Sequence, residues 1–225
     1  GKTDTGKTDT GKTDTGKTDA GKTDTGKTDA GKVPDTNKPP LEVGTVRRFG
    51  AIANEETPAM TRLSNGELLL AGYTASTGAG GWDGLVVRLA PCGKLLQART
   101  YGGKGKDRFH GAAATADGGA WLVGSTTSYS THSEALVVRV DAKGVVMSAG
   151  AHGGAHFDEA LDVAALNQGG AAAVAKTYSF GPATPKTHNM LVMAFSSNGK
   201  LAWGKAFGGD KDGDAGFAIV GLGSG

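Results

Sequence analysis

The chain has 225 residues, of which 39 are glycine, and its 24 Lys and Arg residues stand against 22 Asp and Glu. Charge is nearly balanced both before and after residue 40, so no basic face for nucleic acid or an anionic membrane is predicted. Cys92 is the only cysteine, which excludes an internal disulfide and a multi-cysteine zinc site, and no apolar run reaches the roughly 18 residues of a membrane span.

The first forty residues form a low-complexity segment. The unit Gly-Lys-Thr-Asp-(Thr or Ala) recurs every five residues from Gly1 to Gly26, and residues 33–40 are rich in proline. This segment has almost no large apolar side chain to bury, so conformational entropy favours an extended, solvated chain. We predict a disordered tail and proline-rich linker over residues 1–40, which serves as a spacer.

The tail also matches the phosphate-binding loop pattern G-x-x-x-x-G-K-[ST], over residues 1–8 and again over 6–13. A working phosphate loop needs a buried strand before it and a helix after it, which fix the backbone N–H groups around the phosphates. Both neighbours of these matches are more of the same repeat. Nucleotide binding is therefore not predicted.

A long internal period organises the rest of the chain. An aromatic or histidine residue followed by glycine recurs at Phe49, Tyr101, His152 and Phe207, with spacings of 52, 51 and 55 residues. Glycine turns and short apolar stretches keep step between these points. The expected strands are 59–63, 68–74, 85–89, 111–115, 120–126, 136–140, 160–166, 171–177 and 191–195, and each unit closes with a further strand.

Four short strands in about 50 residues is the size of a propeller blade. We predict an all-β, propeller-like fold over residues 41–225, with units at about 50–101, 102–152 and 153–207 and a partial unit at 208–225. A β-sandwich or a β-solenoid is less compatible with so regular a period of this length.

The units do not add up to a closed propeller. Lone strands are expected at 42–49 and 216–222, which gives about three and a half blades, whereas a ring usually needs four or more. The expectation is an incomplete ring from a truncated chain, or from one whose partner supplies the missing strands. Its open sheet edges predict self-association.

The clearest unit resembles the glycine-rich β-propeller repeats of secreted and cell-surface bacterial and archaeal proteins. The residues that carry the resemblance are Tyr101-Gly102-Gly103, Asp107, Asp117-Gly118-Gly119, Val123-Gly124-Ser125-Thr126, Leu136-Val137-Val138-Arg139-Val140-Asp141 and Lys143-Gly144. Weaker copies extend it from Phe49 to about Phe217. The resemblance implies a propeller fold and an exported location, and it brings no catalytic residues. It also marks Asp83, Asp107 and Asp158 as repeat acids.

Two short patterns suggest metal ligands. His152 and His156 are four residues apart, but the intervening glycines argue against a helix that would bring their rings together. The segment Asp210–Asp214 has the alternating acids of a calcium loop, yet Ala215 and Gly221 stand where such a loop needs glycine and glutamate. The predicted roles are structural or loop histidines and an acidic turn between units, with a weak calcium contact as the alternative at the acidic segment. No cofactor is predicted, and no residue is assigned as a metal ligand.

The least similar loops, 75–82, 127–133 and 178–189, should share one rim of the predicted propeller, where binding residues are tolerated. The candidate ligand-facing residues there are Trp82, Tyr129, His132, Tyr178 and His188. Trp121 and Trp203 lie within expected strands and are predicted to be core residues.

The chain contains neither a G-x-S-x-G nucleophile elbow nor an H-E-x-x-H zinc motif. We therefore predict a non-enzymatic repeat protein, exported or displayed on the cell surface in the manner of a lipoprotein, with its export signal outside this chain. It would act as a spacer or as an interaction module for an unknown protein or glycan. The alternative is a fragment of a propeller hydrolase whose catalytic residues lie elsewhere.

Overall fold

The computed structural model describes residues 53–182 and 186–221, all within the second of the two units into which the chain divides, Gly50–Gly225. The predicted tail, the proline-rich linker and the expected strand at 42–49 lie outside the described residues. The one helical segment among those described is a 3-10 turn, η1 (Asn167–Gly169). No described helix has the length and apolar character that crossing a membrane requires.

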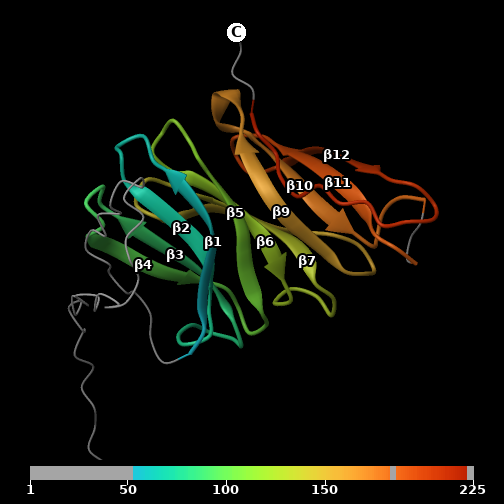
Figure 1. Ribbon diagram of the computed structural model, residues 1–225, viewed down its shortest axis with the longest axis horizontal. Helices are drawn as coiled ribbons and strands as arrows, with labels where there is room; N and C mark the ends of the chain where they lie inside the picture. The colour runs from blue at the N-terminus through green and yellow to red at the C-terminus, as the bar shows by residue number, and fades with distance from the viewer. Residues whose placement is uncertain (1–52, 183–185, 222–225) are drawn as a thin grey trace, which may run out of the picture. The chain divides into compact units, whose positions relative to one another are not determined.

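The strands form three four-stranded antiparallel sheets in which neighbours in sequence are neighbours in space (Figure 1). The first sheet contains β1 (Glu55–Arg62), β2 (Leu68–Thr74), β3 (Asp83–Leu89) and β4 (Leu95–Tyr101). The second contains β5 (Asp107–Ala114), β6 (Ala120–Thr126), β7 (Glu134–Val140) and β8 (Val146–His152). The third contains β9 (Asp158–Ala165), β10 (Ala171–Thr177), β11 (Asn189–Phe195) and β12 (Leu201–Phe207).

The predicted all-β fold of four-stranded units is confirmed. The second strand of each unit begins and ends at the predicted residues, and each third strand begins two residues earlier than predicted. The turn before each second strand has a glycine with positive φ: 85° at Gly66, 82° at Gly118 and 79° at Gly169. Because residues with a Cβ rarely adopt this conformation, these glycines punctuate the sequence at a fixed period.

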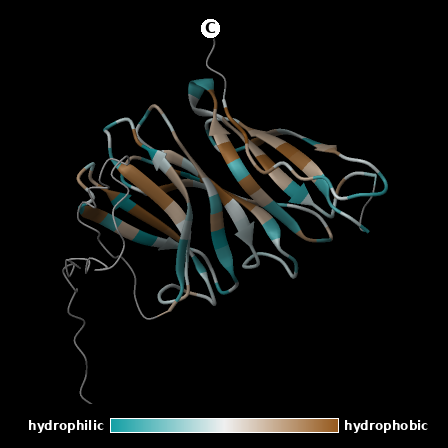
Figure 2. Ribbon diagram, viewed as in Figure 1, coloured by the Kyte–Doolittle hydropathy of each residue, from teal (hydrophilic) through white to brown (hydrophobic). Residues whose placement is uncertain are grey.

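The second sheet is buried on both faces. On β6, Ala120 and Leu122 belong to the core shared with the first sheet, whereas Trp121 and Val123 belong to the core shared with the third. Successive side chains of a strand point to opposite faces, so a strand of a sheet that is covered on both faces needs apolar residues at successive positions. Figure 2 shows hydrophobic residues, in brown, along strands of all three sheets. The second sheet thus packs on one sheet through each face, whereas a sheet of a two-sheet sandwich packs on another through one face only.

The described residues form an incomplete ring, which agrees with the prediction. The strand expected at 216–222 is wrong for the residues that the structure describes. Residues 216–221 form no strand, although Ile219 N donates to Asp162 Oδ2 at 2.9 Å and so lies against β9. A ladder needs a neighbouring strand, and none of the described residues pairs with this segment. Phe217 and Val220 are consequently 77% exposed each.

The two tryptophans expected in the core differ in burial. Trp121 is fully buried, as predicted, but Trp203 on β12 is 53% exposed, so that prediction is wrong. Trp203 pairs with Ala194 of β11. The corresponding residue in the second sheet is Ser148 of β8, which pairs with Arg139. Ser148 lies against Gly199 of the third sheet. No fourth sheet among the described residues covers the corresponding face at Trp203.

Candidate binding rim

An acidic residue opens the first strand of each sheet and is anchored by the loop that follows the second strand. In the second sheet Asp107 is buried and accepts hydrogen bonds from Gly103 N at 2.9 Å, from Ser128 Oγ at 2.6 Å and from Thr126 Oγ1. A buried carboxylate with several donors ties the loops that reach it into one rigid arrangement.

The same arrangement recurs on both sides. Asp158 accepts from Gly154 N at 2.9 Å and from Ser179 Oγ at 2.6 Å, and Glu55 accepts from Thr74 Oγ1 at 3.1 Å and from Ser76 Oγ. The sequence analysis missed the hydroxyl partners. Their signal is a Thr-x-Ser pattern at the end of every second strand, at 74–76, 126–128 and 177–179.

Asp83, the remaining repeat acid, opens β3 and is also buried. It accepts from Ala79 N at 3.2 Å and from Gly80 N at 3.1 Å, within the loop that precedes it. A Cβ at Gly102 would collide with the carboxylates of both Asp83 and Asp107, so only glycine fits between them. These acids hold the rim loops in place and are not themselves presented to solvent.

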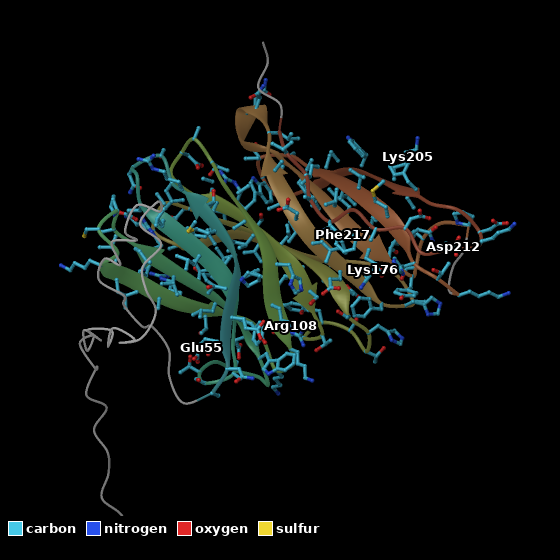
Figure 3. All side chains as sticks on the ribbon, in the orientation of Figure 1. Glu55, Arg108, Lys176, Lys205, Asp212 and Phe217 are labelled. Carbon is cyan, nitrogen blue, oxygen red and sulfur yellow. The ribbon has the colours of Figure 1, made fainter. Side chains whose placement is uncertain are left out.

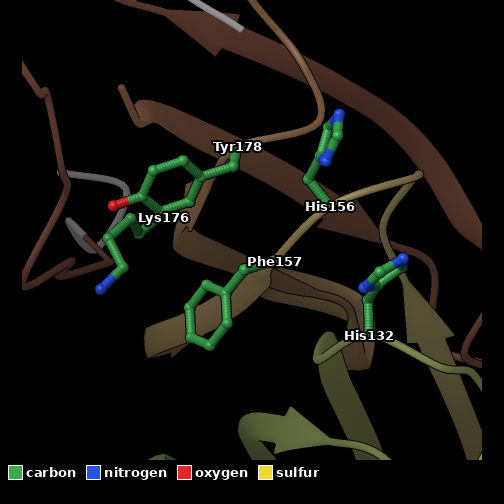
Figure 4. A pocket seen from close by; sticks show the side chains of 5 residues that line it. All are labelled: His132, His156, Phe157, Lys176 and Tyr178. Carbon is green, nitrogen blue, oxygen red and sulfur yellow. The ribbon is translucent and has the colours of Figure 1, made fainter. Parts of the chain in front are cut away.

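An open depression of about 480 Å³ lies on this rim, lined by His132, His156, Phe157, Lys176 and Tyr178 (Figure 4). The β6–β7 loop supplies the first of these residues, the β8–β9 loop the next two, β10 the lysine, and the residue after β10 the tyrosine. None of the five carries a carboxylate. The depression presents two aromatic rings, two imidazoles and one ammonium group.

The aromatic side chains of the depression support one another. The rings of Phe157 and Tyr178 meet edge to face at 6.1 Å, and Tyr178 contacts the His188 ring at 5.5 Å. Lys176 Nζ lies 5.2 Å from the centre of the Phe157 ring. Such contacts hold the rings in fixed orientations before a ligand arrives.

The predicted rim residues therefore fall into three groups. His132 and Tyr178 line the depression and His188 packs against it, so two of the three predicted loops, 127–133 and 178–189, meet there. Tyr129 is 69% exposed on its loop. Trp82 belongs to another cluster, in which its ring contacts Tyr73 at 5.2 Å. His156, Phe157 and Lys176 were not predicted, because the repeat assigns them to a connecting loop and a strand.

Glu159 on β9 is a shared partner beside the depression. Its Oε1 lies 2.9 Å from His110 Nε2 on β5, and its Oε2 lies 3.5 Å from Lys176 Nζ. The interaction with His110 is the main cause that holds the pKa of Glu159 below its ordinary value of 4.5, against the effect of burial, and Lys176 adds to it. Glu159 thus links the second and third sheets while fixing the lysine.

This pKa shift predicts an acid-dependent contribution to stability. Because the pKa of Glu159 is lower in the folded than in the unfolded chain, its contribution is complete above pH 4.5 and is lost as pH falls through the folded value. The wild-type chain should therefore lose more free energy of unfolding than Glu159→Gln when pH drops below 4.5. Urea unfolding at a series of pH values measures this, and parallel losses in both chains would refute it.

The two histidines considered as metal ligands have different surroundings. His152 ends β8 and packs edge to face on Phe195 at 5.1 Å, where burial lowers its pKa. His156 lies in the next loop, and its backbone N–H donates to Ser179 Oγ at 3.1 Å. No group of three or more His, Cys, Asp or Glu side chains in the described part of the chain could hold a metal ion.

The acidic segment Asp210–Asp214 follows the glycine pattern of the other units. Asp214 Oδ2 accepts from Gly209 N at 3.0 Å, as Asp107 accepts from Gly103 and Asp158 from Gly154. Asp214 N in turn donates to His188 O at 2.9 Å. Its carboxylate therefore takes the position of a repeat acid in a turn between units.

No protein-family model matches the chain, and a search of curated proteins found no match. Among solved structures, the chain is similar to a protein of unknown function from Bacteroides caccae, with 13% sequence identity and a TM-score of 0.34. The match covers 68% of this chain and 67% of the other.

Proposed function

We propose that this protein is a non-enzymatic interaction module, exported or displayed on the cell surface, and that it binds a glycan or protein through the rim that carries the depression. The observation that carries this proposal is the open depression itself. It gathers two aromatic rings, two imidazoles and a lysine from three connecting segments and one strand. Aromatic faces with a few polar groups are the usual lining of ligand sites.

The state of the acids supports a binding role over catalysis. A glycoside hydrolase would need carboxylates that reach a substrate. Asp83, Asp107 and Asp158 are instead buried and accept hydrogen bonds from backbone and hydroxyl groups, and Glu159 is engaged by His110 and Lys176. The alternative of a propeller-hydrolase fragment would place its catalytic residues outside the described residues.

The repeated tail supports display. Its charge balance and lack of apolar side chains suit a spacer that holds the folded units away from an anchoring point. The resemblance to exported glycine-rich repeats agrees with that location. A spacer without a ligand is the rival within this class of function.

Binding of the full chain to glycan and protein arrays tests the proposal. The Phe157→Ala variant should lose at least about tenfold in affinity for a captured ligand, because it removes a ring that faces the depression and supports Tyr178. Tyr129→Ala is the matched control, since it removes a more exposed aromatic ring outside the depression.

Three outcomes would contradict the proposal. Absence of binding on both arrays by a folded chain would leave the spacer role. Unchanged binding by Phe157→Ala would place the ligand elsewhere on the surface. Turnover of an array substrate would favour the enzyme alternative.

A further inference from the structure

Two cationic side chains lie over one indole ring where the first and second sheets meet. Arg108 Cζ is 3.8 Å and Lys106 Nζ is 4.6 Å from the ring centre of Trp82. Tyr73 extends the aromatic surface, with its ring centre 5.4 Å from Arg108 Cζ. We call Tyr73, Trp82, Lys106 and Arg108 the cationic cluster.

The backbone fixes this cluster in advance. Asp107 N donates to Trp82 O at 2.8 Å, which fastens the β2–β3 loop of the first unit to the start of β5. Lys106 N donates to Thr127 Oγ1 at 2.8 Å, and Lys106 O accepts from Thr127 N at 2.9 Å. A ligand that binds here therefore orders little additional chain, which favours affinity.

The two cations have no acidic partner within residues 53–182 and 186–221. No carboxylate there makes an ion pair or a hydrogen bond with the guanidinium of Arg108 or the ammonium of Lys106. The nearby Glu56 bonds the Tyr73 hydroxyl, which raises the pKa of that hydroxyl. The carboxylates of Asp83 and Asp107 are buried and bonded to other donors. Among the described residues, the N–H groups of Arg108 thus have no carboxylate partner.

A stacked guanidinium without a carboxylate partner suits one kind of ligand group. Its planar fork matches the paired oxygens of a carboxylate or sulfate, and charge-assisted bonds of this type are stronger than neutral ones. The ammonium of Lys106 on the same ring adds a second positive charge. A bound anion would offset the electrostatic repulsion between these two neighbouring charges. The cluster therefore favours an oxyanion over a neutral ligand.

A chain of contacts leads from β5, which carries Arg108, to the depression. Two residues after Arg108 on β5, His110 reaches Glu159 on β9 at 2.9 Å, and Glu159 reaches Lys176 in the depression at 3.5 Å; Figure 3 labels Arg108 and Lys176. In the second unit Ser125 and Ser133 take the repeat positions that Tyr73 and Trp82 take in the first. No aromatic pair like that of Tyr73 and Trp82 therefore stands at these two positions of the second unit.

We propose that the cationic cluster binds the carboxylate or sulfate groups of an acidic glycan whose sugar rings lie in the neighbouring depression. This inference rests on the proposed function and specifies its ligand. Two sources supply the same chemistry: a uronate chain carries carboxylates, and a sulfated sugar chain carries sulfates. The ring faces of Phe157 and Tyr178 would contact the sugars, while Arg108 and Lys106 would bind their anionic groups.

Calorimetric titration of the full chain tests the inference with three oligosaccharides of equal length: a uronate, a sulfated chain and a neutral chain. At least one acidic chain should bind more tightly than the neutral one, and added salt should weaken that binding. The double variant Lys106→Gln and Arg108→Gln should bind the acidic chain at least tenfold more weakly. Lys205→Gln is the matched control, because Lys205 also lies over an aromatic ring, Phe207, but on β12.

The outcomes separate this inference from the proposed function. If binding depends on Phe157 but not on Lys106 and Arg108, or if the neutral chain binds equally well, the acidic-glycan assignment is overturned and the rim remains a binding face. Equal binding of a polynucleotide would also overturn it, since the cluster would then attract any polyanion. If no glycan binds and Phe157 has no effect on any array ligand, both proposals fall.

Discussion

Replacing Trp121 by alanine should destabilise the folded units by about 3–5 kcal/mol, the range measured when large buried aromatic residues are truncated. Trp121 is fully buried between the second and third sheets, where its ring centre lies 6.0 Å from that of Phe195. Its Nε1 also donates to Gly169 O at 3.1 Å, so the change leaves both a cavity and an unpaired carbonyl. Loss of this size is a large fraction of the stability of an ordinary domain.

Trp203→Ala provides the matched comparison. Trp203 also lies in a strand, but it is 53% exposed on β12, so its removal should cost less than about 1 kcal/mol. Urea denaturation followed by circular dichroism measures both variants. Equal losses would mean that the face of Trp203 is covered in solution, and near-zero losses for both would mean that the second and third sheets do not pack as described.

The contrast between these two tryptophans shows how far the sequence predicts the fold. The period of about 50 residues and the glycine turns predict strand order and most strand boundaries, because both depend on local backbone conformation. The burial of Trp121 also follows, since β6 lies in the middle sheet. Trp203 lies instead on a fourth strand, and fourth strands are exposed or half-buried in all three sheets; on β12 the number of neighbouring sheets also differs, since no further sheet among the described residues covers it. That number is a property of the assembled units and is absent from the local sequence.

The candidate site was predicted in part for a similar reason. Loop variability between units drew attention to His132, Tyr178 and His188, which the fold brings together in or beside the depression. Lys176 was not predicted to line a site because it occupies a strand position, next to Ala175, which stands where the other units have Gly72 and Gly124. The contact between His110 and Glu159 joins residues of different units, and no pattern within a unit predicts it.

Self-association through open edges remains a prediction, and the structure sharpens where to look for it. Trp203 and Phe207 on β12, with Phe217 and Val220 beyond it, leave apolar side chains exposed at the third sheet. The repeat acids, in contrast, form contacts within a unit. Asp107 and Asp158 each accept hydrogen bonds from the loop that follows the second strand of the same unit. The stability of each unit should therefore depend strongly on its acid, even though no acid contributes apolar surface.

Asp107→Ala is expected to cost about 3 kcal/mol or more, because it leaves Gly103 N, Thr126 Oγ1 and Ser128 Oγ without their shared acceptor in a buried site. Asp212→Ala is the control, since Asp212 is an exposed acid in the turn after β12 and should change stability by less than about 0.5 kcal/mol. Urea denaturation gives both values, and amide hydrogen exchange of residues 103–107 should accelerate only in Asp107→Ala.

A finer comparison separates the hydrogen bonds from the charge. Asp107→Asn keeps the shape and one acceptor oxygen, so its cost should fall between those of the wild type and Asp107→Ala. If the asparagine variant is as stable as the wild type, hydrogen bonding alone anchors the loop. If Asp107→Ala itself costs no more than Asp212→Ala, the repeat acid does not hold the rim, and the fixed geometry assumed for the cationic cluster next to it loses its support.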